Sequence, residues 1–131
     1  MSASKAIRAA LRTQLLTVGT LPAARAWENK GFKPTHGTAY VEEALIPASR
    51  RPASTGMIEQ RGIFQVTLVV PANDGTMAHE DIIDAILAAF APTTDCSGVC
   101  TIERSEPNPP RQDGVWFRMP VSVRWRAYAF Y

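Results

Sequence analysis

The two cysteines are the most reactive side chains of this 131-residue sequence, and they lie close together in Asp95-Cys96-Ser97-Gly98-Val99-Cys100. A structural zinc site needs about four ligands, and the two histidines, His36 and His79, lie far off in sequence without paired spacing. A local disulfide is geometrically possible, although a reducing compartment disfavours it. We therefore expect two free thiols near the start of a strand, and no metal ion.

The other groups that could do chemistry do not form a catalytic pattern. His79-Glu80-Asp81 stands where a helix is expected to begin, and negative charge is favoured there by the helix dipole. Glu42 and Glu43 are neighbours in a predicted strand, so their side chains point to opposite faces and cannot act as a pair. Gly56 and Gly62 are isolated, and neither opens a helix after a strand as a phosphate loop requires. The sequence therefore favours neither an enzyme nor a cofactor.

Length and composition indicate one soluble domain spanning residues 1–131. The chain is 46% hydrophobic and 20% charged, which is the usual balance of a globular protein. No apolar run reaches the roughly 18 residues that cross a membrane. The first residues lead into an amphipathic stretch interrupted by Arg8 and Arg12, so we expect no signal peptide and a cytoplasmic location.

Two helices are expected to support a sheet. The first runs over residues 4–17, where apolar residues recur every three or four positions and Gly19 follows. The second begins after the turn at Asn73–Thr76, where Asp74 or Thr76 can cap it, and ends before Pro92. Its apolar stripe comprises Ile82, Ile83, Ile86, Leu87 and Phe90.

Four strands are predicted from alternating apolar and polar residues and from β-forming residue types. They cover Thr38–Ile46, Ile58–Val70, Val99–Ser105, and Val115 to the C-terminus. The element order α-β-β-α-β-β predicts an α+β fold, with a four-stranded antiparallel sheet and two helices packed on one face. The expected core consists of Phe64, Val66, Leu68, Ile83, Leu87, Phe117, Val121 and Val123.

Two connecting segments stand out. Residues 47–57 exceed the about two to five residues that a tight hairpin needs, and they are basic and poor in large apolar residues. They predict a long mobile hairpin loop, which is either an ordinary hairpin tip or an arm that orders against a neighbouring subunit. In the segment Ala26–Pro34, Trp27 and Phe32 are expected to anchor an irregular loop onto the core.

The last strand offers a candidate interface. Alternation places Trp116, Arg118, Arg124 and Arg126 on one face, opposite the apolar face, and arginine and tryptophan are enriched at protein–protein contacts. With Arg50 and Arg51 of the long loop, these residues form our predicted interface. A solvated sheet face and a nucleic-acid-binding sheet are the alternatives. A net charge of +2 argues against specific binding of nucleic acid.

An ordered set of motifs resembles the small tail-terminator-like proteins of siphophages and prophages. Trp27-Glu28-Asn29 and Phe32-Lys33-Pro34 follow the first helix, and Arg61-Gly62-Ile63-Phe64-Gln65-Val66 leads to Pro71. Trp116-Phe117-Arg118-Met119-Pro120-Val121 and Trp125-Arg126-Ala127 close the chain. The resemblance covers nearly the whole sequence, and each motif alone would be weak.

The resemblance implies a non-enzymatic α+β subunit of a hexameric ring, which could be a monomer in isolation. Such a ring caps the tail tube, ends its polymerisation and provides the surface on which the head joins. Its implied partners are the major tail tube protein and a head-completion or connector protein, with no membrane. It would assemble in the host bacterial cytoplasm and end in the virion tail. A head–tail joining or minor tail protein, and a small binding module for nucleic acid, are the alternative functions.

Overall fold

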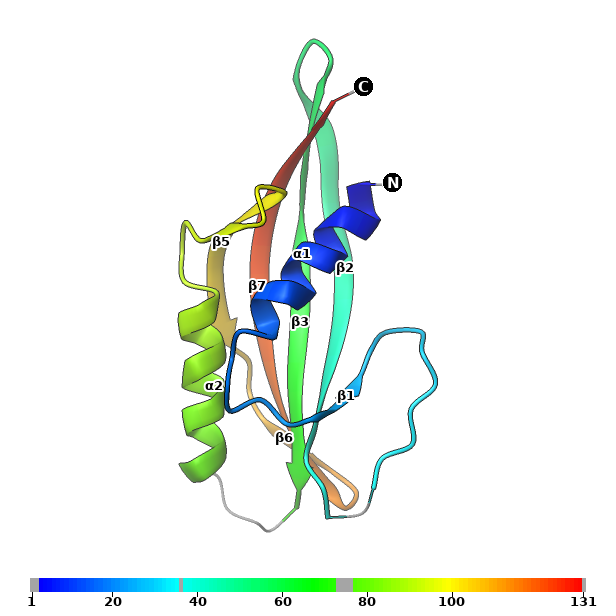
Figure 1. The fold of residues 1–131 in the computed structure, drawn as a ribbon, viewed down its shortest axis with the longest axis vertical. Helices are drawn as coiled ribbons and strands as arrows, with labels where there is room; N and C mark the ends of the chain where they lie inside the picture. Colours follow the sequence, from blue (N-terminus) through cyan, green and yellow to red (C-terminus); the bar gives the residue numbers. More distant parts are fainter. Residues whose placement is uncertain (1–2, 36, 73–76, 131) are drawn as a thin grey trace.

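The structure is a computed structural model that describes residues 3–35, 37–72 and 77–130. Two helices, α1 (Ala3–Leu15) and α2 (Met77–Ala89), accompany a large sheet (Figure 1). The turn at residues 73–76, with its predicted helix caps, lies outside the described residues. The strands are β1 (Ala24–Ala26), β2 (Tyr40–Ser54), β3 (Met57–Pro71), β4 (Asp95–Cys96), β5 (Cys100–Pro107), β6 (Arg111–Asp113) and β7 (Trp116–Phe130).

The sheet contains seven described strands in the order β1-β2-β3-β7-β5-β4, and β6 also pairs with β7. β1 runs parallel to β2, whereas the other paired strands are antiparallel. The α+β class is consistent with this architecture, but the prediction of a four-stranded antiparallel sheet was wrong. The added strands β1, β4 and β6 have only two or three residues, which is too short for alternation to be visible in a sequence.

One face of the sheet carries the hydrophobic core, to which both helices contribute. In Figure 1, α1 crosses in front of the central strands and α2 runs beside β5. Of the predicted core, six residues are buried, whereas Leu87 and Phe117 are only partly buried against it. The six are Phe64, Val66, Leu68, Ile83, Val121 and Val123. Alternation therefore identified the core-facing side of β3 and β7 correctly.

The long hairpin loop predicted at residues 47–57 is instead a paired ribbon, which we call the arm. β2 and β3 stay paired as far as Ser54 and Met57, with register shifts between Pro47 and Ser49 and between Pro52 and Ser54, so the turn has only two residues, Thr55 and Gly56. Gly56 has φ of 77°, the left-handed conformation that such turns require. The sequence predicted a loop because this segment is rich in Arg, Pro and Ser and lacks β-forming residues. β2 is the outermost strand here, where the missing N–H groups of its prolines are tolerated.

The arm forms the upper end of the molecule in Figure 1, and its tip extends beyond both helices. β7 supports it from the other side of β3, because Met57 pairs with Phe130 and Gln60 with Ala127. Residues 46–55 are all exposed. The mobility of the free arm remains a prediction.

Candidate assembly interface

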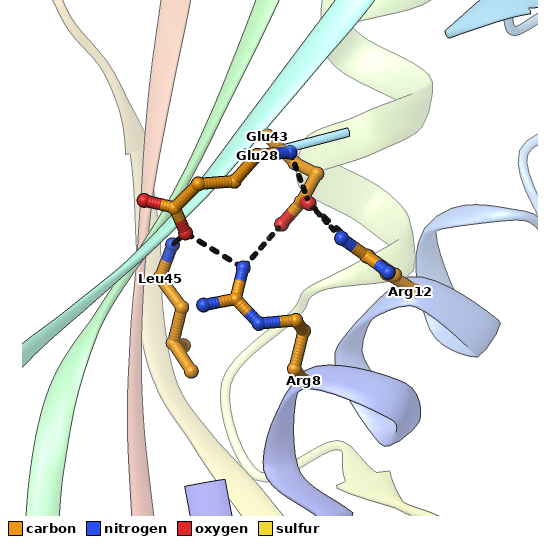
Figure 2. Close-up of polar contacts among 5 residues, drawn as sticks. All are labelled: Arg8, Arg12, Glu28, Glu43 and Leu45. Carbon is orange, nitrogen blue, oxygen red and sulfur yellow. Dashed lines mark hydrogen bonds and ion pairs between the residues drawn. The ribbon is translucent and has the colours of Figure 1, made fainter. Parts of the chain in front are cut away.

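A buried carboxylate ties α1 to the helix-covered face of the sheet. The side chain of Glu43, from β2, is fully buried, and Figure 2 shows it between Arg8 and Arg12 of α1. Arg12 Nε donates to Glu43 Oε1 at 3.1 Å, and the backbone N–H of Glu28 donates to the same oxygen at 3.0 Å. Donors of this chain therefore satisfy the carboxylate, and its role is to hold elements together rather than to bind a substrate.

Glu28 extends this network to the edge of β2. Its carboxylate accepts the backbone N–H of Leu45 at 3.1 Å and Arg8 Nη1 at 2.6 Å. The hydrogen bond from Leu45 and then that from Arg8 lower the pKa of Glu28 below its ordinary value of 4.5. The guanidinium of Arg12 lies 4.8 Å from the centre of the Trp27 ring. Trp27 thus anchors its segment on the core as predicted.

Sequence reasoning missed this network, although a signal was present. Glu43 shares its face of β2 with the buried Val41 and Leu45, and a charged residue at a core-facing position requires partners. The prediction that Glu42 and Glu43 point apart is confirmed. Glu42 Oε2 accepts Arg118 Nη1 at 2.8 Å on the opposite face of the sheet.

That opposite face, which we call the outer face, is partly covered at the end near β6. Tyr40 and Val69 are buried there. Phe32 lies on the Tyr40 ring with centroids 4.9 Å apart, and Trp116 meets the same ring edge-on at 5.3 Å. Burial, helped by the nearby Glu42, raises the pKa of Tyr40 above 10.0. Phe32 therefore anchors its loop on this outer face, and the prediction that it packs on the core was wrong.

Two of the predicted interface residues are engaged within the chain at this covered end. Trp116 packs on Tyr40. Arg118 is held between two carboxylates, with Nη1 at 2.8 Å from Glu42 Oε2 and Nε at 2.8 Å from Asp113 Oδ2. Only 20% of the Arg118 side chain is exposed. These contacts give both residues a structural role that alternation alone did not reveal.

The other end of the outer face carries four arginines in two opposed pairs, which we call the arginine patch. Arg61 of β3 lies opposite Arg126 of β7, and Arg124 of β7 lies opposite Arg104 of β5. Like charges directly opposite each other on a sheet are destabilising. Sequence analysis identified Arg124 and Arg126 but missed Arg61 and Arg104, because their placement depends on the register between strands.

Carboxylates of the same face compensate the patch only in part. Glu59 Oε1 lies 2.9 Å from Arg61 Nε, and Glu106 Oε1 lies 3.7 Å from Arg124 Nε. Arg126 lies over the ring of Tyr128, at 5.8 Å from its centre. Among the described residues, the Nε atoms of Arg124 and Arg126 have no hydrogen-bond partner. These Nε atoms are themselves buried, so an external acceptor could reach only the exposed part of the patch, which includes 42% of the Arg124 side chain.

The arm places Arg50 and Arg51 on opposite faces, because they are adjacent in β2. Arg51 Nη2 lies 3.2 Å from Glu59 Oε1 on the outer face. Arg50 pairs in register with Gln60 on the helix-covered side. Both arginines are exposed. Arg50 has no ion-pair partner within the part of the chain that the structure describes.

The cysteines lie away from these surfaces. Cys96 and Cys100 are free, buried and directly opposite each other in β4 and β5. The Cys100 thiol donates a hydrogen bond to Cys96, and this bond and burial raise the pKa of Cys100 above its ordinary value. Within residues 3–35, 37–72 and 77–130, no cluster of three or more His, Cys, Asp or Glu side chains could hold a metal ion. The described helices include none that is long and apolar enough to span a membrane.

Comparison with known proteins shows similarity both to a protein family and to solved structures. A family model described as "phage tail terminator protein" matches residues 6–125. A solved structure whose name carries no function is 28% identical, with a TM-score of 0.69, and the alignment covers 100% of this chain and 98% of that chain. A search of the curated proteins found no match. The family match spans both helices and all of the described strands, except the first three residues of α1 and the last five residues of β7.

Proposed function

We infer a role in tail assembly from one premise: the chain belongs to the family of phage tail terminator proteins. We propose that it forms a ring that caps the tail tube, ends the polymerisation of the tube and presents the surface on which the head joins. The ring contains six copies of the chain, and its work is structural rather than catalytic. Its partners are the major tail tube protein on one side and a head-completion or connector protein on the other.

The observation that carries this proposal is the arginine patch together with the arm. A self-sufficient monomer gains nothing from opposed arginines, which repel each other across neighbouring strands. At a subunit interface, the same side chains can donate to carboxylates or carbonyl groups of a partner. Arg124 and Arg126 are therefore the side chains that we place at contacts between subunits or with the tube. Arg50 and Arg51 extend this contact surface onto the arm.

In this proposal, the two remaining predicted residues support the interface without contacting a partner themselves. Trp116 and Arg118 hold the covered end of the outer face through Tyr40, Glu42 and Asp113. We propose that they fix the orientation of β7 and thereby position Arg124 and Arg126 farther along the same strand. The subunit assembles in the host bacterial cytoplasm and then remains in the virion tail.

Deletion of the gene from the phage or prophage that carries it tests the function directly. We expect overlong tails without heads, seen by electron microscopy of the lysate, and normal tails when the chain is supplied from a plasmid. Tails of normal length that fail to join heads would favour a head–tail joining protein instead. Normal infectious particles without the gene would contradict both roles.

A further inference from the structure

A groove separates α2 from the proline-rich turn that follows β5. Its volume is about 280 Å³, and its floor is formed by apolar side chains that include Ile83, Leu87 and Met119. Glu80 and Asp84 line it from one side. These two residues are one helical turn apart, so their carboxylates lie on the same side of α2. Both residues are exposed, and among the described residues neither has an ion-pair partner.

The arm presents the complementary chemistry on its helix-side face. Arg50 pairs with Gln60, and Pro52 pairs with Ile58. Gln60 in turn lies opposite Ala127, which belongs to the core, so all four side chains are on that side of the sheet. Arg50 and Pro52 are exposed and Ile58 is half-buried. This face therefore offers one unpaired cation beside two apolar side chains.

The two surfaces lie at opposite ends of the molecule. In Figure 1 the arm forms the upper end, whereas the first turns of α2 and the strand β6 lie toward the lower end. A subunit cannot bring its own arm to its own groove without unfolding. Two different patches that complement each other on separate copies produce a head-to-tail contact, which closes into a ring when the rotation between neighbours permits.

We propose that the helix-side face of the arm of one subunit docks in the α2 groove of a second copy. Arg50 approaches the carboxylates of Glu80 and Asp84, and Pro52 and Ile58 lie on the apolar floor. The proposal rests on the ring described above and specifies the contact between neighbouring subunits. Because the contact is repeated around the ring, every arm is occupied except where the ring is open.

Charge exchange between the two surfaces tests this contact. The purified full-length chain is studied by mass photometry and analytical ultracentrifugation, alone and with purified tail tubes. We expect Arg50→Glu and Asp84→Arg each to weaken self-association by about tenfold or more, because each brings like charges together across the interface. The chain that carries both substitutions should recover most of this loss, because the pair is restored with its polarity reversed.

Matched variants separate the contact from general charge effects. Arg50→Gln should weaken association, whereas Lys30→Gln, which removes a positive charge from an exposed residue outside the arm, should leave it unchanged. Asp81→Arg adds the same charge as Asp84→Arg to the exposed surface of α2, but Asp81 does not line the groove. It should also associate like the wild type. Circular dichroism of each variant checks that the monomer stays folded.

Each alternative result has a distinct meaning. The docking of the arm in the α2 groove would be wrong if the ring formed equally well with Arg50→Glu. It would also be wrong if the double variant did not recover self-association. Neither result would contradict the ring itself. If Asp84→Arg loses binding to tail tubes but keeps self-association, the groove takes the tube protein and the proposal is wrong. A wild type that stays monomeric at every concentration, and on tail tubes, would overturn the ring and this contact with it.

Discussion

The two ends of the outer face of the sheet differ in how completely the chain satisfies its own side chains. At the end near β6, Tyr40 and Val69 are buried and Arg118 has two carboxylate partners. At the arm end, Arg61 lies opposite Arg126 and Arg104 lies opposite Arg124, and the carboxylate of Glu106 is 3.7 Å from Arg124 Nε. Like charges that lie directly opposite each other destabilise a subunit on its own. The covered end therefore stabilises the subunit, and we propose that the arm end is completed by a neighbouring subunit.

The largest effect on stability is expected in the core beneath the covered end. Ile83→Ala removes a side chain that is 7% exposed and should lower the free energy of unfolding by about 2–5 kcal/mol. Phe117→Ala should fall at the lower limit of that range, because Phe117 is only partly buried. Urea denaturation measures both. A loss below about 1 kcal/mol for Ile83→Ala would show that α2 is not packed as described.

Gly62 sits where the body of the sheet passes into the arm, and its replacement should have the next largest effect. A Cβ atom at this position would lie 2.5 Å from Trp125 Cζ2 and 2.6 Å from the carbonyl oxygen of Ile46. Backbone would have to shift, so Gly62→Ala should destabilise the subunit by about 1–3 kcal/mol. Thermal unfolding checks this value. Gly19→Ala, which meets nothing within 4 Å, is the control.

The contribution of Glu28 to the stability of the subunit should be smaller than that of Gly62, and lowering the pH should reveal it. Because the folded state lowers the pKa of Glu28 from 4.5, its contribution is fully present above about pH 4.5. It is lost as the pH falls through the lower folded value. Glu28→Gln should therefore be less stable than the wild type at neutral pH, and the difference should shrink at lower pH. Urea midpoints between neutral pH and pH 3 measure it. If the wild type and Glu28→Gln differ in stability by the same amount at neutral pH and at pH 3, Glu28 does not contribute to the loss of stability in acid.

The smallest effect on the monomer is expected at the arginine patch. Arg124→Glu combined with Arg126→Glu should change stability by about 0.5 kcal/mol or less per position, because both side chains are partly exposed. The same variant should fail to restore normal tails in the deletion strain. Normal tails and full infectivity would remove these residues from the interface. A variant that unfolds would show that the patch stabilises the subunit.

Long periodic elements could be predicted from the sequence, and contacts that depend on register could not. The alternation in β3 and β7 and the apolar stripe of α2 identified the core, because burial itself imposes these periods. The arm was mistaken for a loop because its pairing depends on β3 and not on its own residue types. The opposed arginines of the patch come from three strands, so only the register brings Arg61 and Arg104 beside Arg124 and Arg126.

Amide hydrogen exchange of the free subunit and of the assembled ring tests the central claim most directly. Residues 64–70 of β3, in the body of the sheet, should be protected in both states. Residues 47–57 of the arm should exchange fast in the free subunit, because few buried contacts hold them, and slowly once the ring has formed. Strong and equal protection of the arm in both states would contradict the claim that this end of the molecule is completed by a neighbour.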